Sequence, residues 1–242
     1  MTPICPHCRN RGYKIVQVNG YSVADGYCSC PFGAKLFFVH WRQKMLDAHI
    51  YEEYHPLEIQ HLVPQEYPEH VKFVKHVAGY LQALDANAST GKSMLISGGA
   101  GTGKTLAGML VLKEALRHKK TAYYVTWPEL LTMFIQDYDD EKKEHRDKVR
   151  ESSFLVIDQL GADSIKKESR HPSTTLEEVL RYRFTRLKPT ILITELSYTE
   201  VSLRFNIVED FKDKLEVVEV RGKNWRSLKG TRRTKEGDAH GN

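Results

Sequence analysis

The sequence lacks any long apolar run, which excludes one broad class of protein. No stretch of its 242 residues approaches the roughly 20 consecutive apolar residues that a membrane-spanning helix needs. The N-terminus shows no basic region followed by an apolar one, so no secretory signal is visible. We therefore expect a cytoplasmic protein without a membrane partner.

Acidic residues are missing from one stretch near the C-terminus. Between Arg221 and Lys235 every charged residue is basic. The net charge of +5 permits a polyanionic partner but does not demand one. We expect residues 229–242 to form a basic disordered tail, and contact of this stretch with nucleic-acid phosphates is the alternative.

The remaining composition is typical of a globular protein. Hydrophobic residues make up 40% of the chain and charged residues 28%. Apolar strands are expected at 93–97, 121–125, 154–157, 190–194 and 217–220. Helices are expected at 37–54, 69–84, 105–116 and 174–187 and from Trp127 onward, with 86–92 as a polar loop. This alternation predicts an α/β fold with helices on both faces of a parallel sheet.

The strongest motif is a glycine-rich loop between the first of these strands and the next helix. It fits the pattern G-x-x-x-x-G-K-[ST] and consists of Gly98, Gly99, Ala100, Gly101, Thr102, Gly103, Lys104 and Thr105. Glycines allow successive backbone N–H groups to point at phosphates, and the helix N-terminus adds its positive end. Lys104 supplies charge to the β- and γ-phosphates, and the Thr105 hydroxyl can coordinate magnesium. The loop predicts a site for ATP and Mg²⁺.

An acid stands where such a loop requires one. Asp158 directly follows the apolar run 154–157, as expected of the Walker B aspartate that holds magnesium. In hydrolytic relatives the next residue is a second acid, usually Glu, which polarises the attacking water. Here it is Gln159, whose amide can position water but cannot accept its proton. We therefore expect retained nucleotide binding with impaired hydrolysis.

Three interpretations of Gln159 remain open. The chain can be a slow ATPase that uses ATP as a switch. Another acid, Asp163 or Glu195, can substitute for the missing carboxylate. The glutamine can also be a deliberate replacement of glutamate, made to trap the ATP-bound state.

All four cysteines lie within the first 30 residues, in two close pairs. Cys5 pairs with Cys8, and Cys28 pairs with Cys30. Tetrahedral zinc takes four thiolate or imidazole ligands, and two such pairs provide them at low chain-entropy cost. A cytoplasmic setting argues against disulfides. We predict a structural zinc site formed by the four thiolates, with His7 as the alternative to one of them.

Together these motifs resemble the DnaC/DnaI-type replicative helicase loaders, which share an AAA+ ATPase domain with the IstB transposition ATPases. The resemblance rests on the cysteine module, the glycine-rich loop, the run 155–162 and the segment 188–197. It implies an AAA+ P-loop fold, in which helices flank a five-stranded parallel sheet, together with a small N-terminal zinc-binding domain. It divides the chain into a partner-docking module at 1–54, a linker at 55–68 and an ATPase domain at 69–228.

The resemblance also implies roles for single residues. Thr194, or Glu195 beside it, falls at sensor 1, where the family usually has Asn. Arg204 matches the arginine finger that reaches the ATP of a neighbouring subunit, and Arg226 matches sensor 2. Three arginines on the preceding helix are rivals of this finger: Arg181, Arg183 and Arg186. The catalytic centre would comprise Lys104, Asp158, Gln159 and Arg204.

The function implied by the resemblance is ATP-dependent loading of a replicative hexameric DNA helicase. Such a loader would self-associate through its ATP sites into a spiral on single-stranded DNA, and its N-terminal module would dock the helicase. One alternative is an IstB-like regulator of transposition that acts on duplex DNA. Another is a non-hydrolysing ATP-binding adaptor.

Overall fold

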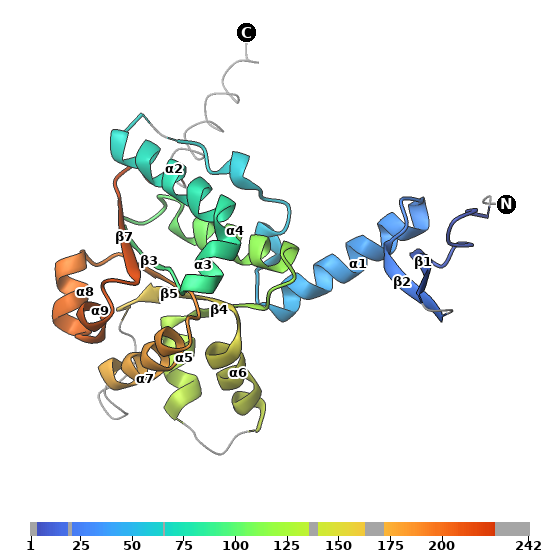
Figure 1. The fold of residues 1–242 in the computed structure, drawn as a ribbon. Coiled ribbons are helices and arrows are strands. Elements are labelled where there is room, and N and C mark those ends of the chain that lie inside the picture. Colours follow the sequence, from blue (N-terminus) through green and yellow to red (C-terminus); the bar gives the residue numbers. More distant parts are fainter. Residues whose placement is uncertain (1–3, 19–20, 65, 136–139, 163–171, 226–242) are drawn as a thin grey trace, which may run out of the picture. The chain divides into compact units, whose positions relative to one another are not determined.

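The computed structural model describes residues 4–18, 21–64, 66–135, 140–162 and 172–225. The chain divides into two units, Met1–Asp47 and Ala48–Asn242 (Figure 1). The second unit thus begins before the end of the segment 1–54 that the sequence assigns to an N-terminal module. Within the described ranges, no helix has the length and apolar character needed to cross a bilayer.

The first unit is a β-hairpin followed by a helix. Strands β1 (Tyr13–Val18) and β2 (Tyr21–Tyr27) pair antiparallel, and helix α1 (Pro31–Asp47) follows. The Tyr27 hydroxyl lies 2.9 Å from His40 Nδ1, which ties the hairpin to α1. Helix α1 begins and ends earlier than the helix predicted at 37–54, and the hairpin was not predicted.

The second unit confirms the predicted five-stranded parallel sheet. Its strands lie in the order β4-β5-β6-β3-β7. They are β3 (Ser93–Gly98), β4 (Ala122–Thr126), β5 (Phe154–Leu160), β6 (Thr190–Thr194) and β7 (Leu215–Val220). The side chains of β4 and β6 are buried throughout, as expected of a sheet covered on both faces.

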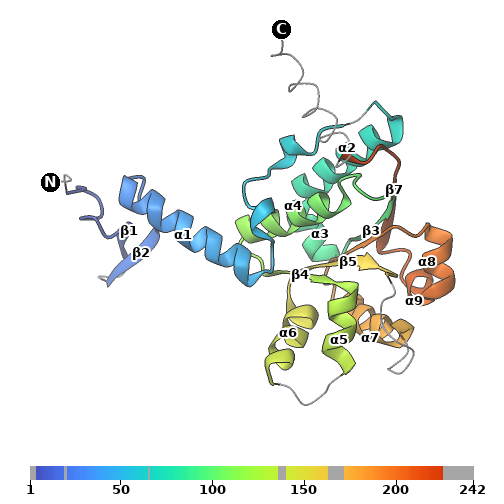
Figure 2. The ribbon, with the colours of Figure 1, turned by 180° about the vertical axis from the view of Figure 1, so that it is seen from behind.

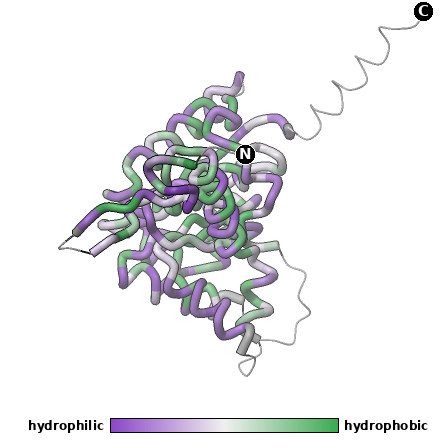
Figure 3. The backbone as a smooth tube through the Cα atoms, turned by 90° about the vertical axis from the view of Figure 1, so that its right-hand side faces the viewer, coloured by the Kyte–Doolittle hydropathy of each residue, from purple (hydrophilic) through white to green (hydrophobic). Residues whose placement is uncertain are grey.

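Helices cover both faces of this sheet (Figures 1 and 2). One layer contains α2 (Pro68–Gln82), α3 (Leu84–Thr90) and α4 (Lys104–Arg117). The other contains α5 (Trp127–Ile135), α6 (Asp140–Glu151) and α7 (Pro172–Thr185). Two short helices, α8 (Tyr198–Arg204) and α9 (Ile207–Asp210), precede β7. Hydrophobic and hydrophilic residues intermingle along the chain, as amphipathic helices require (Figure 3).

Helix α3 corrects the prediction of a polar loop at 86–92. The Asn87 side chain is buried and donates to the Tyr80 carbonyl at 3.0 Å. The Thr90 hydroxyl donates to the Ala86 carbonyl at 2.9 Å, and Gly91 ends the helix in the left-handed region at φ 71°. Side-chain hydrogen bonds therefore stabilise a helix whose composition resembles that of a loop.

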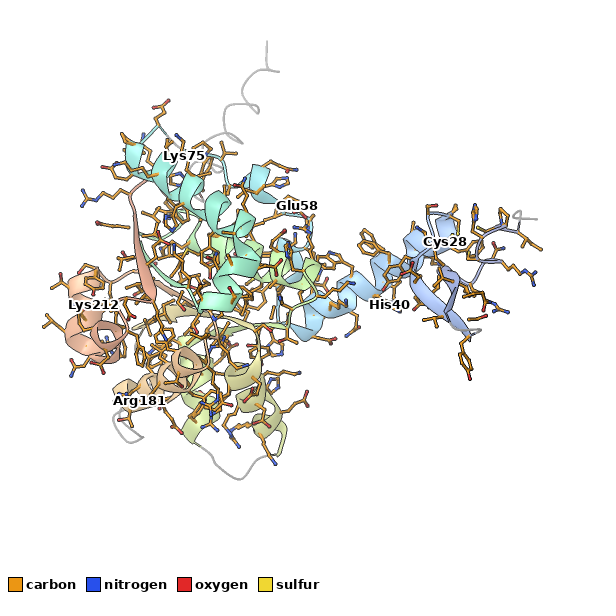
Figure 4. All side chains as sticks on the ribbon, viewed as in Figure 1. Cys28, His40, Glu58, Lys75, Arg181 and Lys212 are labelled. Atoms are coloured by element: carbon orange, nitrogen blue, oxygen red, sulfur yellow. The ribbon has the colours of Figure 1, made fainter. Side chains whose placement is uncertain are left out.

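The segment after α1 is bound to α4 by a buried lysine. It contains two 3-10 turns, Glu52–Tyr54 and Ile59–His61. Lys113 Nζ donates to the carbonyl of His55 at 2.9 Å, to the carbonyl of Leu57, and to Glu58 Oε1 at 3.1 Å. Arg117 adds two hydrogen bonds to the Glu58 carboxylate at 2.6 and 2.7 Å, and Figure 4 labels Glu58 on this segment. Much of the predicted linker 55–68 is thus fixed to the ATPase-like unit.

Arg183 is a second buried cation, and it joins α7 to the end of α6 and the start of β6. Its guanidinium donates to the carbonyls of Val149, Ser152 and Pro189 at 2.8–2.9 Å and to the Thr190 hydroxyl at 2.9 Å. Burial lowers the pKa of Arg183 to about 9, and the ring of acceptors compensates for the lost hydration. Its full burial excludes it as a rival for the intersubunit arginine finger.

Replacing Arg183 with Leu should destabilise the protein by about 3–5 kcal/mol, because several buried carbonyls would lose their donor. The matched control is Arg181→Leu, since Arg181 is exposed and pairs with Glu177; its loss should cost under about 1 kcal/mol. Urea unfolding followed by tryptophan fluorescence measures both. Equal effects of the two variants would contradict the structural role of Arg183.

Candidate functional site

The carboxyl end of β3 passes into a glycine-rich loop that curls around a lysine. Lys104 Nζ donates to the carbonyls of Gly98 and Gly99, both at 2.7 Å, and its side chain is buried. Gly101 has φ 69°, and a Cβ atom there would meet the Asn224 side chain at 1.9 Å. The loop is therefore closed on its own lysine, and a bound phosphate would replace these carbonyls as the partner of the ammonium group.

Two contacts from outside support the loop. His70 in α2 is buried, and its Nε2 lies 3.1 Å from the carbonyl oxygen of Thr102. The backbone N–H of Trp225 donates to the Gly101 carbonyl at 2.9 Å. The loop is thus held between α2 and the segment that follows β7.

Asp158 lies at the carboxyl end of β5, beside the first turn of α4. The hydroxyls of Thr105 and Tyr124 donate to its Oδ2 at 2.8 and 3.0 Å. The backbone N–H of Gln159 donates to its Oδ1 at 2.7 Å. Adjacent oxygen ligands of an octahedral magnesium lie about 2.9 Å apart when each bond is 2.0–2.1 Å. The spacing of Thr105 and Asp158 therefore suits Mg²⁺.

Gln159 stands at an irregularity of β5. Its φ is 59°, in the left-handed region, and the pairing of β5 with β6 shifts register between Ile157 and Leu160. The Gln159 side chain is exposed and lines the cavity described below. The bulge turns this side chain away from the packed sheet and toward the space above the loop.

The two sensor 1 candidates have different surroundings. Thr194 is buried, and its hydroxyl donates to the Leu160 carbonyl at 2.7 Å and accepts from the Leu196 backbone at 3.1 Å. Glu195 has an exposed side chain that lines the same cavity as Lys104. Thr194 thus stabilises the ends of two strands, and Glu195 presents a carboxylate to the cavity.

These groups surround a cavity of about 780 Å³. Its walls include the loop, the ends of β5 and β6, residues between Tyr54 and Val63, and Trp225. Burial lowers the pKa of Lys104, while the negative charges of Glu195 and Asp158 oppose that shift. The cavity can hold a polyanion with an attached apolar or aromatic group.

The remaining candidate arginines lie in different places. Arg204 ends α8, and its Nη1 donates to the carbonyl of Gly161, a cavity residue, at 3.2 Å. Arg181 and Arg186 are exposed, and the Arg186 guanidinium stacks 3.9 Å from the Tyr182 ring centroid. Arg226, the alternative acid Asp163 and the predicted tail 229–242 lie outside the described residues.

The four cysteines gather in the first unit. Their sulfur atoms all lie within 4.8 Å of one another, with Cys5–Cys28 at 3.8 Å and Cys8–Cys30 at 3.5 Å. Disulfide sulfurs would lie about 2.05 Å apart, whereas sulfurs on a tetrahedral zinc lie about 3.8 Å apart for Zn–S bonds of 2.3 Å. The arrangement therefore suits zinc.

The backbone around Cys28 and the pKa of its thiol are consistent with this fit. Gly33 at the start of α1 packs so closely on Cys28 that a Cβ atom would meet the Cys28 carbonyl oxygen at 1.8 Å. The backbone N–H of Cys30 lowers the pKa of Cys28, but burial and the neighbouring thiols together raise it to about 11. Four thiolates this close need a cation to balance their charge.

Some residues of the site carry no motif in the sequence. Tyr124 lies in the strand expected at 121–125, and its hydroxyl donates to Asp158 Oδ2. His70 and the wall at 54–63 carried no motif. A signal for Tyr124 would have been its place two residues before the end of β4, next to the strand that carries Asp158, since Thr126 pairs with Asp158.

The chain is similar to known ATP-binding and DNA-replication proteins. Residues 72–231 match the family model of IstB-like ATP binding proteins. The structure of the DnaC helicase loader is similar, with a TM-score of 0.60 and 19% identity over 71% of this chain and 100% of that one. The structure of DnaI gives a TM-score of 0.58 and 18% identity over 72% and 93%.

A third similar structure is the replication initiator DnaA bound to AMPPCP and single-stranded DNA. Its TM-score is 0.56, with 16% identity over 77% of this chain and 56% of that one. At such identities these likenesses establish the fold. No curated protein matches the sequence significantly.

Protein purified without added zinc should carry about one zinc ion per chain, measured by mass spectrometry of the metal. Cys8→Ala should lower the content below about half an equivalent, because a tetrahedral site would lose a buried ligand. His7→Ala is the matched control, since His7 is exposed and lies between two cysteines; it should keep its zinc. Loss of zinc in the His7 variant alone would contradict the four-thiolate site.

Proposed function

Because the chain belongs to the family of IstB-like ATP binding proteins, we propose that it uses ATP to load a replicative hexameric DNA helicase onto single-stranded DNA. The cavity supports ATP and Mg²⁺ as its ligands. The backbone N–H groups of the loop and Lys104 would hold the phosphates, and Thr105 and Asp158 would hold the metal. Magnesium, when bound, neutralises charge on the β- and γ-phosphate oxygens.

The N-terminal unit is the observation that favours a loader. Its four-cysteine cluster would hold a structural zinc ion, because a domain this small has too little hydrophobic core to be stable without a metal or disulfides. Large apolar side chains are exposed on it, among them Tyr21 at 76%, Phe38 at 70% and Val39 at 55%. Exposed apolar residues on a separate unit suit a protein partner, so we assign helicase docking to this unit. Figure 4 labels Cys28 and His40 in it.

Assembly would run through the ATP sites. Arg204 is half-buried at the last turn of α8, and a guanidinium is always charged and binds phosphate oxygens in a fixed fork. We propose that it reaches the ATP of a neighbouring copy and that Arg226 reads the nucleotide within the same chain. ATP would then act as the switch between single and assembled copies.

The structural relatives support this proposal by analogy. One is described as a helicase loader, and another was solved with an ATP analogue and single-stranded DNA. The resemblance to IstB transposition ATPases leaves a transposition regulator as the alternative, and such a regulator would prefer duplex DNA. Gln159 suits an adaptor that binds ATP without splitting it. The preference for single-stranded or duplex DNA, and the effect of ATP on DNA affinity, distinguish the loader, the transposition regulator and the adaptor.

The loader function is tested with the full chain, its host's replicative helicase and circular single-stranded DNA, which a closed hexamer cannot thread. With ATP, the protein should increase helicase loading at least tenfold, measured as helicase that co-elutes with the circle. Phe38→Glu should abolish the increase, because it puts a charge on the docking surface, while ATP binding stays unchanged. Preference for duplex DNA without helicase binding would favour transposition, and DNA affinity that ignores ATP would favour the adaptor.

The ATP switch is tested by two substitutions. Lys104→Ala should weaken ATP binding at least tenfold, because the phosphates lose a buried cation. Arg204→Ala should bind ATP normally but fail to assemble, seen as a monomer mass in light scattering with ATP and DNA present. Arg186→Ala is the control on an exposed arginine and should assemble. Normal assembly of the Arg204 variant would place the finger elsewhere.

A further inference from the structure

A carboxylate besides Asp158 stands in the nucleotide cavity. Glu195 directly follows β6, which lies between the strand that carries the phosphate loop and the strand that carries Asp158. The last residue of β6, Thr194, pairs with Ser97 on one side and with Leu160 on the other. Glu195 therefore follows the end of the strand that lies between the phosphate loop and Asp158.

The described residues that line the cavity offer few groups able to accept a proton. Their carboxylates are Asp158 and Glu195. Asp158 Oδ2 already accepts hydrogen bonds from the hydroxyls of Thr105 and Tyr124, and Thr105 and Asp158 together form the place where magnesium fits. His61 Nδ1 accepts the Glu58 backbone N–H at 2.8 Å, so the proton of the neutral ring sits on Nε2. An exposed carboxylate with access to water remains at Glu195.

We propose that Glu195 is the general base for ATP hydrolysis in this chain, in place of an acid at position 159. The inference rests on the proposed ATP-binding function. The water oxygen forms a bond to the γ-phosphorus while the bond from that phosphorus to the β–γ bridging oxygen breaks. ADP keeps the electrons of the broken bond, and the proton of the water passes to the Glu195 carboxylate, which then releases it to solvent. Gln159 contributes its amide to the position of the water.

The charge of Glu195 separates this role from a structural one. Its negative charge and that of Asp158 both act on Lys104. The γ-phosphate binds beside the same lysine, so Glu195 repels it. Removing the charge should then leave ATP binding equal or tighter. If Glu195 only held Lys104 in place, the same change would weaken binding.

The experiment compares Glu195→Gln with the wild-type chain and with Glu69→Gln, a control on an exposed glutamate in the first turn of α2. Affinity for ATP and steady-state turnover are measured for each, with single-stranded DNA present. Glu195→Gln should lower turnover about 100-fold or more, with ATP bound as tightly as before or tighter. Glu69→Gln should change neither quantity.

A second variant moves the carboxylate across the cavity. Adding Gln159→Glu to Glu195→Gln should raise turnover at least tenfold above that of the single variant, because the base returns on the adjacent strand. Recovery of this kind shows that the carboxylate, rather than the fold, was missing.

Three results would overturn the proposal: equal turnover of Glu195→Gln and wild type, loss of ATP binding in Glu195→Gln, or a wild-type chain that binds ATP and never splits it. A wild-type chain that does not bind ATP would instead contradict the proposed function itself.

Discussion

Three hydrogen bonds converge on the carboxylate of Asp158, and the nucleotide site depends on them. Their donors are Thr105 at the end of the phosphate loop, Tyr124 in β4 and the backbone of Gln159 in β5. An unpaired carboxylate in this buried place would be costly, so the three segments are held at a common point. The donors thereby fix the metal ligands before any cation arrives, which is the preorganisation that phosphate chemistry requires.

The parts of the fold that the sequence predicts are those governed by local pattern. The sheet strands are short apolar runs, because a parallel sheet is buried on both faces. The β1–β2 hairpin escaped prediction since β2 is almost wholly exposed and shows no alternation of buried and exposed residues. Helix α3 was not predicted because Asn87 and Thr90 are typical of loops, yet Asn87 donates to a carbonyl of α2 and Thr90 to a carbonyl of α3 itself.

The residues of the site likewise divide into those with a local sequence pattern and those without one. The glycine-rich loop and Asp158 are predictable from spacing, and the four cysteines from their pairing. Tyr124 bonds to a residue 34 positions away and His70 to one 32 positions away, and neither contact has a local signature. Arg183 is a residue for which the prediction was wrong. A guanidinium suits an arginine finger that reaches a neighbouring subunit, but Arg183 is buried and donates hydrogen bonds to backbone carbonyls.

Helix α4 gives the nucleotide cavity a fixed length. Lys104 at its first turn belongs to the phosphate loop, and Lys113, nine residues on and thus about 14 Å along the axis, binds the segment that forms another wall. The two walls are therefore joined by a helix whose length is fixed by its backbone hydrogen bonds. Substitutions inside the cavity can therefore alter its chemistry while α4 keeps the distance between these two walls.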